Sequence, residues 1–137
     1  MSARLLIETF TFLKRPTSIQ PTARLVLLAV AEEARERPRG QLAARQARIT
    51  ADEMAVRVGV EPASLTKIYR HLAARGLEVR VPIAPLDGAG RMVFARNGAT
   101  TTFELPDFDG YRHVERKKRP GNGTAGAGRR ARERGVS

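Results

Sequence analysis

The order of apolar and polar residues predicts helices in the first half of the chain and extended segments in the second. Residues 21–37, PTARLVLLAVAEEARER, carry a dense run of aliphatic residues and then turn charged, which is typical of a central helix buried over its first half. Thr22 is the candidate N-cap of this helix. Glu33 and Arg37 stand four residues apart, so we expect an ion pair on its exposed second half.

The segments on either side of this helix each allow two interpretations. Residues 5–13 fit either a short strand or the leading turn of a helix. Residues 38–47, PRGQLAARQA, begin with a proline and fit either a loop or an extra helical turn. We expect Phe10, Phe12 and Leu13 to lie outside the core, where they would serve a homodimer.

A capping signal opens the next helical segment. Thr50 and Glu53 form the pattern T-x-x-E, a capping box that satisfies free backbone N–H groups at the start of a helix. The predicted helix covers residues 51–58, and its apolar face consists of Met54, Ala55 and Val58. Gly59 follows, and glycine readily adopts the positive φ that a sharp turn between helices needs.

The helix after this turn has clearly separated apolar and polar sides. Pro62 suits its first turn, where a missing backbone N–H costs nothing, and we expect it to run to about Arg75 and to end at Gly76. Residues at three- and four-residue spacing define the buried side: Leu65, Ile68, Tyr69 and Leu72. The opposite side carries Ala63, Lys67, Arg70 and Ala74.

The residues that follow predict a strand pair. Residues 76–84, GLEVRVPIA, alternate as a strand does, and residues 85–90, PLDGAG, form a turn cluster. Residues 91–97, RMVFARN, predict the returning strand. Residues 100–106, TTTFELP, predict either a third strand or a continuation of the second.

Seven positions of the two-helix segment carry a resemblance to a known family. Counted from Ala51, a small residue stands fifth, a glycine ninth, and apolar residues fourth, eighth, tenth, fifteenth and eighteenth. These are Ala55, Gly59, Met54, Val58, Val60, Leu65 and Ile68. Together with the predicted hairpin, residues 20–106 resemble the winged helix-turn-helix superfamily of bacterial regulators and replication initiators.

The resemblance implies an α+β fold in which a three-helix core carries a β-hairpin wing, within a domain of residues 1–111. It also implies a short strand at residues 47–50 that pairs with the hairpin. The insert at residues 38–47 departs from the usual pattern of the family.

The charge of the chain favours a polyanionic partner. Lys and Arg number 25 against 14 Asp and Glu, which gives a formal net charge of +11. Residues 112–137 alone hold nine Lys or Arg and two Glu, together with many Gly and Ala. Such a segment lacks the apolar surface to offset chain entropy, so we predict a disordered basic tail that neutralises phosphates.

The resemblance also implies which residues contact double-stranded DNA. In that superfamily the second helix of the pair enters the major groove, which here is the helix over residues 62–75. Its reading face would comprise Ser64, Thr66, Lys67, Arg70 and His71. Arg91 would contact DNA from the wing and Arg57 would face the phosphate backbone. The basic cluster of the tail consists of Arg116, Lys117, Lys118 and Arg119.

Other classes of function have little support in the sequence. The chain has no cysteine and two histidines, and it shows no catalytic triad spacing, phosphate loop or metal-ligand cluster, so we expect no enzyme activity, cofactor or metal. Asp107 and Asp109 are typical of a turn. The sequence shows no apolar run long enough to span a membrane and no clear signal peptide, so we expect a cytoplasmic protein.

These observations predict a sequence-specific DNA-binding protein, with transcriptional regulation as the favoured role. Three alternatives remain open from the residues alone. One is a replication or partition factor of a plasmid or phage, because one fold serves many functions. The second is a basic RNA-binding protein. The third is a protein–protein adaptor that reuses the predicted reading face.

Overall fold

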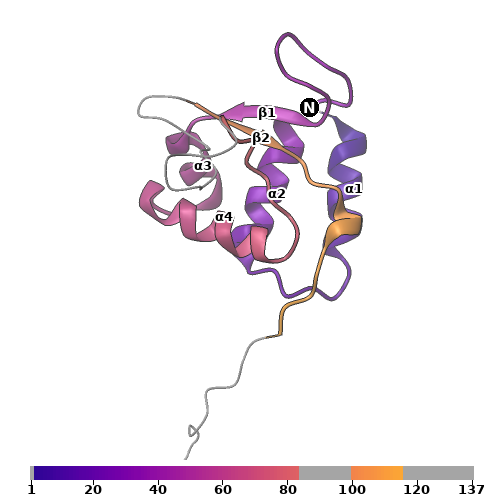
Figure 1. The fold of residues 1–137 in the computed structure, drawn as a ribbon, viewed down its shortest axis with the longest axis vertical. Coiled ribbons are helices and arrows are strands. Elements are labelled where there is room, and N and C mark those ends of the chain that lie inside the picture. Colours follow the sequence, from indigo (N-terminus) through magenta and orange to yellow (C-terminus); the bar gives the residue numbers. More distant parts are fainter. Residues whose placement is uncertain (1, 84–99, 116–137) are drawn as a thin grey trace, which may run out of the picture.

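The computed structural model describes residues 2–83 and 100–115, and within them the chain forms an α+β fold. Four helices are present: α1 (Ala3–Leu13), α2 (Pro21–Glu33), α3 (Ala51–Val58) and α4 (Leu65–Ala74). Two strands, β1 (Gln46–Ile49) and β2 (Thr101–Glu104), pair antiparallel. The helix α2 lies in the middle, with α1 on one side and α3 and α4 on the other (Figure 1). The predicted α+β class is confirmed.

The segment with two interpretations at residues 5–13 is helical. Ser2 caps α1 by accepting a hydrogen bond from the Leu5 backbone N–H at 3.3 Å. The expectation that Phe12 and Leu13 lie outside the core was wrong: Leu13 packs against the core, and Phe12 is buried and stacks on Phe108, with ring centroids 4.5 Å apart. The sequence pattern around Phe12 is local, whereas its partner lies 96 residues further along the chain. Phe10 is exposed as expected, and Leu13 is half-buried against the core.

The central helix differs from its prediction at both ends. Gln20 occupies the N-cap of α2 and Pro21 its first turn, so Thr22 lies inside the helix and does not cap it. The helix ends at Glu33, because Ala34 adopts an extended backbone. The expected ion pair of Glu33 with Arg37 is therefore replaced by a contact with Arg57, described below.

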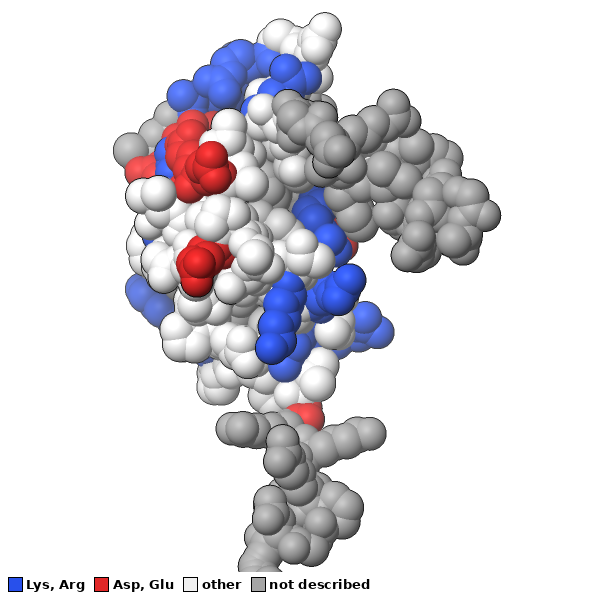
Figure 2. All heavy atoms as spheres, turned by 90° about the vertical axis from the view of Figure 1, so that its left-hand side faces the viewer, with Lys and Arg blue, Asp and Glu red and all other residues white. Residues whose placement is uncertain are grey.

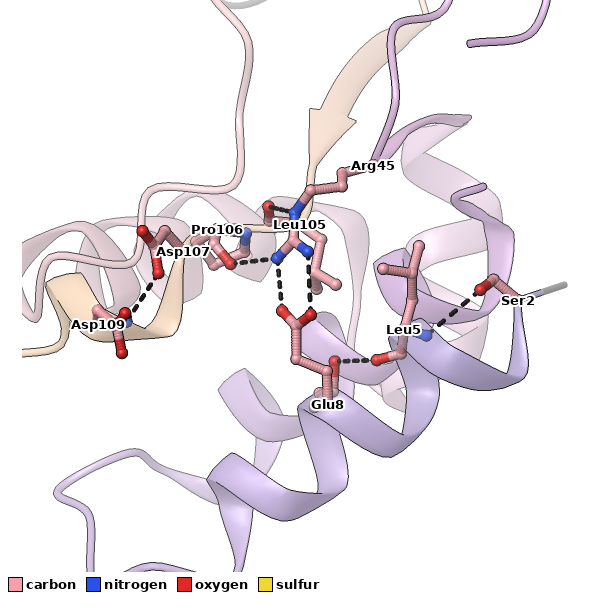
Figure 3. Close-up of polar contacts among 9 residues, drawn as sticks. Ser2, Leu5, Glu8, Arg45, Leu105, Pro106, Asp107 and Asp109 are labelled. Carbon is pink, nitrogen blue, oxygen red and sulfur yellow. Dashed lines mark hydrogen bonds and ion pairs between the residues drawn. The ribbon is translucent and has the colours of Figure 1, made fainter. Parts of the chain in front are cut away.

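The loop after α2 contains a cross-brace between distant parts of the chain (Figure 3). Arg45 has a φ of +70°, which is rare for a residue with a side chain. Its guanidinium donates to both carboxylate oxygens of Glu8, at 3.1 and 2.6 Å, and to the carbonyl oxygens of Leu105 and Pro106. The brace joins α1 to the chain just after β2. Residues 38–47 thus form a loop, one of their two predicted alternatives, that ends in β1.

The two-helix corner forms as its local signals predict. The Thr50 hydroxyl accepts the Glu53 backbone N–H at 3.1 Å. Gly59 ends α3 with a φ of +80°, and the backbone N–H groups of Gly59 and Val60 both donate to the Ala55 carbonyl. A short 3₁₀ turn at Pro62–Ser64 leads into α4. The predicted apolar face of α3 is buried: Met54, Ala55 and Val58.

The strand β2 has a backbone neighbour on each side. Ala47 of β1 lies opposite Phe103 of β2, and Arg80 bridges Phe103 from the other side. Backbone hydrogen bonds from Val81 to Thr102 and from Glu104 to Val79 flank that bridge, at 2.9 and 2.8 Å. The strand expected at residues 76–84 is thus reduced to one isolated bridge. The returning strand expected at residues 91–97 lies outside the described residues.

The chain after β2 runs back past the end of α4 and the start of α2. The Arg112 backbone N–H donates to the Arg75 carbonyl at 2.8 Å, and the Val114 N–H donates to the Ser18 hydroxyl at 3.0 Å. Contacts with the core therefore continue past the expected boundary at residue 111. Residues 116–137, most of the predicted tail, lie outside the described part of the chain.

Candidate nucleic-acid interface

The buried residues of α4 show which side of the helix faces solvent. Four large side chains are buried on the inner side: Leu65, Ile68, Tyr69 and Leu72. Because they recur at three- and four-residue spacing, the remaining positions must point away from the core. Four of the predicted reading residues are exposed there: Ser64, Thr66, Lys67 and Arg70.

Lys67 and Arg70 are free to meet an external partner. Within residues 2–83 and 100–115, neither side chain forms an ion pair or a hydrogen bond. They stand three residues apart on one helix, so their charges lie side by side. Figure 2 shows the side of the molecule that carries α3 and α4. Lys and Arg side chains form two groups on it, one at the top beside acidic side chains and one in the lower part, away from the main acidic groups.

His71 is half-buried and contacts the start of α2. Its Nε2 accepts a hydrogen bond from the Gln20 backbone N–H at 3.1 Å, at the start of α2. Accepting at Nε2 requires the neutral ring. Partial burial, and then the nearby Arg75, lower the pKa of His71 below its ordinary value. The neutral imidazole therefore links α4 to α2.

Arg57 is occupied by three carboxylates. Its guanidinium contacts Glu32 at 3.0 Å, Glu33 at 2.6 Å and Glu53 at 2.6 Å. The hydrogen bond to Glu33 raises the pKa of Arg57, and the same bond lowers the pKa of Glu33. A cation surrounded by three anions presents no net positive charge to phosphate. The structure thus places Arg57 in a link between α2 and α3.

The corner beside Arg57 is acidic on its surface. Asp52 and Glu53 are exposed in the first turn of α3, and Glu61 is exposed just before the 3₁₀ turn. These carboxylates would repel a phosphate backbone. The positive side of the two-helix unit is therefore confined to the middle of α4, around Lys67 and Arg70.

Two further arginines, which the sequence interpretation did not single out, hold α4 in place. The Arg80 guanidinium lies over the Tyr69 ring, 5.4 Å from its centroid, and donates twice to the Glu78 carboxylate. Burial raises the pKa of Tyr69 to about 12. Arg75 donates to the backbone carbonyls of Ser18 and His71. The alternation of residues 76–84 placed Arg80 on a strand but gave no sign of its aromatic partner.

The remaining predicted contacts lie outside the described residues. They are Arg91, Arg116, Lys117, Lys118 and Arg119. Within the described ranges, no group of three or more His, Cys, Asp or Glu side chains could hold a metal ion. Asp107 accepts the Asp109 backbone N–H at 3.0 Å and so shapes a turn. None of the helices in residues 2–83 and 100–115 combines the length and the apolar character needed to cross a bilayer.

Comparison with protein families, curated proteins and solved structures gives no match for this chain.

Proposed function

We propose that this protein binds double-stranded DNA by placing α4 in the major groove. One observation carries the proposal: Lys67 and Arg70 are exposed, unpaired among the described residues, and adjacent on a helix whose other side is buried. An α-helix fits the width of the major groove. Arginine can bind guanine through two parallel hydrogen bonds, and lysine can meet either a base or a phosphate.

The order of the elements supports a winged-helix interpretation. The chain runs through α2, β1, α3, α4, an extended segment at residues 79–81 and β2. The short strand before α3 pairs with the strand that comes last, as the resemblance implies. In a winged helix the wing is the connection between the last two strands. The corresponding connection here is residues 84–99, which include Arg91.

The placement of aromatic rings favours a duplex over single-stranded RNA. Single strands are bound by stacking bases on exposed aromatic side chains. Tyr69 and Phe103 instead face each other within the core, with ring centroids 5.6 Å apart, and both are buried. Phe12 is buried against Phe108, and Phe10, which is 51% exposed, lies on α1, on the other side of α2 from α4. We therefore retain RNA binding only as an outcome of the competition experiment below.

The role we propose is transcriptional regulation. A replication or partition factor would use the same surface, since α4 and its cations serve any sequence-specific duplex contact. Selection of bound duplexes from a random pool supplies the target site. The positions of such sites relative to promoters or origins then distinguish the two roles.

The direct test removes the two cations together. Lys67→Ala with Arg70→Ala should weaken binding to the selected duplex and relax its sequence preference, with about 1–3 kcal/mol of discrimination lost at the base that Arg70 contacts. The matched control is Arg37→Ala with Arg39→Ala, which changes the net charge equally at exposed positions outside α4. Fluorescence anisotropy of labelled duplexes measures both.

Equal losses in the two double variants would contradict the proposal, because they would show that net charge alone controls binding. Preference for single-stranded RNA over the selected duplex in direct competition would also overturn it.

A further inference from the structure

The outward side of α1 carries a stripe of four exposed residues, Ala3, Ile7, Phe10 and Lys14, whose side chains have no partner among the described residues. Its inner side buries Leu5, Thr9 and Phe12 against the core. On its outer side Ile7 is 65% exposed and Phe10 is 51% exposed. Adjacent large apolar side chains at a protein surface commonly mark a site of protein association.

The stripe is complementary to a second copy of itself. Ala3, Ile7, Phe10 and Lys14 follow one another at four-, three- and four-residue spacing, so they lie on one line along α1, and all four are exposed. If two copies of α1 cross antiparallel about a two-fold axis midway between residues 7 and 10, Ile7 of each copy meets Phe10 of the other. The same register places Lys14 opposite Ala3, whose small side chain allows close approach.

The charges at the ends of the stripe match in the same register. Glu36 lies at the start of α1, where it accepts a hydrogen bond from the Ser2 hydroxyl at 2.9 Å and contacts Arg4 at 3.7 Å. Lys14 lies at the other end of α1 and forms no ion pair among the described residues. Antiparallel crossing brings Lys14 of one copy to Glu36 of the other, twice by symmetry. The Arg4 side chain, 82% exposed, is free to move aside.

The stripe stays accessible when α4 is occupied. The helices α1 and α4 lie on different sides of α2, as Figure 1 shows. We propose that this chain forms a two-fold symmetric homodimer through α1, with the Ile7 and Phe10 side chains of both copies at its centre and Lys14 paired with Glu36 at its ends.

The test measures the mass of the full chain in the absence of DNA, by sedimentation velocity over a range of concentrations. It is therefore independent of the function proposed above. The unmodified chain should show concentration-dependent dimerisation. Phe10→Ser should raise the dimer dissociation constant at least about ten-fold, because central aromatic side chains dominate most interfaces. Val56→Ser, at a side chain 81% exposed on α3, is the matched control and should leave it unchanged.

A charge exchange tests the register itself. Lys14→Glu and Glu36→Lys should each weaken dimerisation, and the two together should restore it. Circular dichroism confirms that each variant is folded. A chain that stays monomeric at every concentration would overturn the proposal. So would a dimer that Phe10→Ser leaves intact, or one in which the double exchange is no better than either single change.

Discussion

At the scale of single residues, Arg45 combines an unfavourable backbone with unusually many contacts. Its φ of +70° disfavours a side chain, yet its guanidinium binds Glu8 and two backbone carbonyls. The hydrogen bond with Glu8 raises the pKa of Arg45 above its ordinary value. The contacts offset the backbone strain, which is why an arginine is found at a position that suits glycine.

Two substitutions of Arg45 separate these effects. Arg45→Ala and Arg45→Gly both remove the guanidinium and should lower the free energy of unfolding by about 1–3 kcal/mol. Glycine tolerates positive φ, so Arg45→Gly should be the milder by about 0.5–1 kcal/mol. Urea denaturation of both variants measures the difference. A more stable alanine variant would show that the backbone at this position is not strained.

His71 gives the fold a dependence on pH. Its pKa in the folded protein lies below the ordinary value of 6.5, so the unfolded chain binds more protons between those two values. The contribution of His71 to stability is therefore complete above about pH 6.5 and is lost as the pH falls toward the folded pKa. In His71→Gln this part of the pH dependence should disappear, while His113 remains in both proteins. Thermal unfolding at several pH values from about 8 to 5 tests this.

The residues of the candidate site differ in how far the sequence could predict them. Lys67 and Arg70 were correctly expected to be exposed, because the apolar residues of the same helix define which side faces out. Arg57 followed the same local logic and was expected to face phosphate. Its partners Glu32 and Glu33, however, lie on α2 and are brought near only by the crossing of α2 and α3. Contacts between distant segments leave no periodic signal.

At the scale of elements, the same distinction holds. The corner of α3 and α4 was predicted closely, because a capping threonine and two glycines mark its ends. The end of α2 was missed, because nothing in the charged residues up to Arg37 shows that Ala34 turns extended. The isolated bridge at Arg80 depends on the position of β2, about twenty residues later.

Gly59, at the turn inside this corner, and Gly76, just after it, should differ in their tolerance of alanine. Both have positive φ, but the space around Gly59 is open, whereas a Cβ at Gly76 would lie 2.1 Å from the Gly110 carbonyl oxygen. Gly59→Ala should cost about 1 kcal/mol of stability. Gly76→Ala should cost about 2–4 kcal/mol, because backbone must move. Urea titration of the two variants ranks them, and equal losses would show that the chain around Gly110 yields easily.

At the scale of the whole molecule, positive charge is unevenly distributed. On the side that carries α3 and α4, Lys and Arg form one group beside acidic side chains at the top and another group lower down (Figure 2). Most of the net charge of +11 comes from the C-terminal residues, which hold eight Lys or Arg and one Glu after Glu115. We infer two contributions to binding: α4 supplies sequence preference and the C-terminal residues supply salt-dependent affinity.

Truncation after Glu115 tests this division and keeps the contacts that Arg112 and Val114 make with the core. If residues 116–137 engage about five phosphates, their removal should reduce the log–log salt slope of binding by roughly 4 to 5 units. Affinity should fall for all duplexes alike, with the order of preferred sequences unchanged. Anisotropy titrations at several salt concentrations provide the measurement. A reordering of preferred sequences would mean that these residues read bases.

The position of β2 has a consequence for how the protein matures during translation. The strand β2, which pairs with β1, and the residues that Arg45 braces against α1 are among the last of the described chain to be synthesised. Until residues 101–108 have left the ribosome, Phe12 lacks its stacking partner and Ala47 lacks its neighbour across the sheet. The nascent chain therefore emerges before α1 has its aromatic contact and before β1 has its partner strand. A ribosome stalled before residue 101 would hold a polypeptide that proteases can still cut.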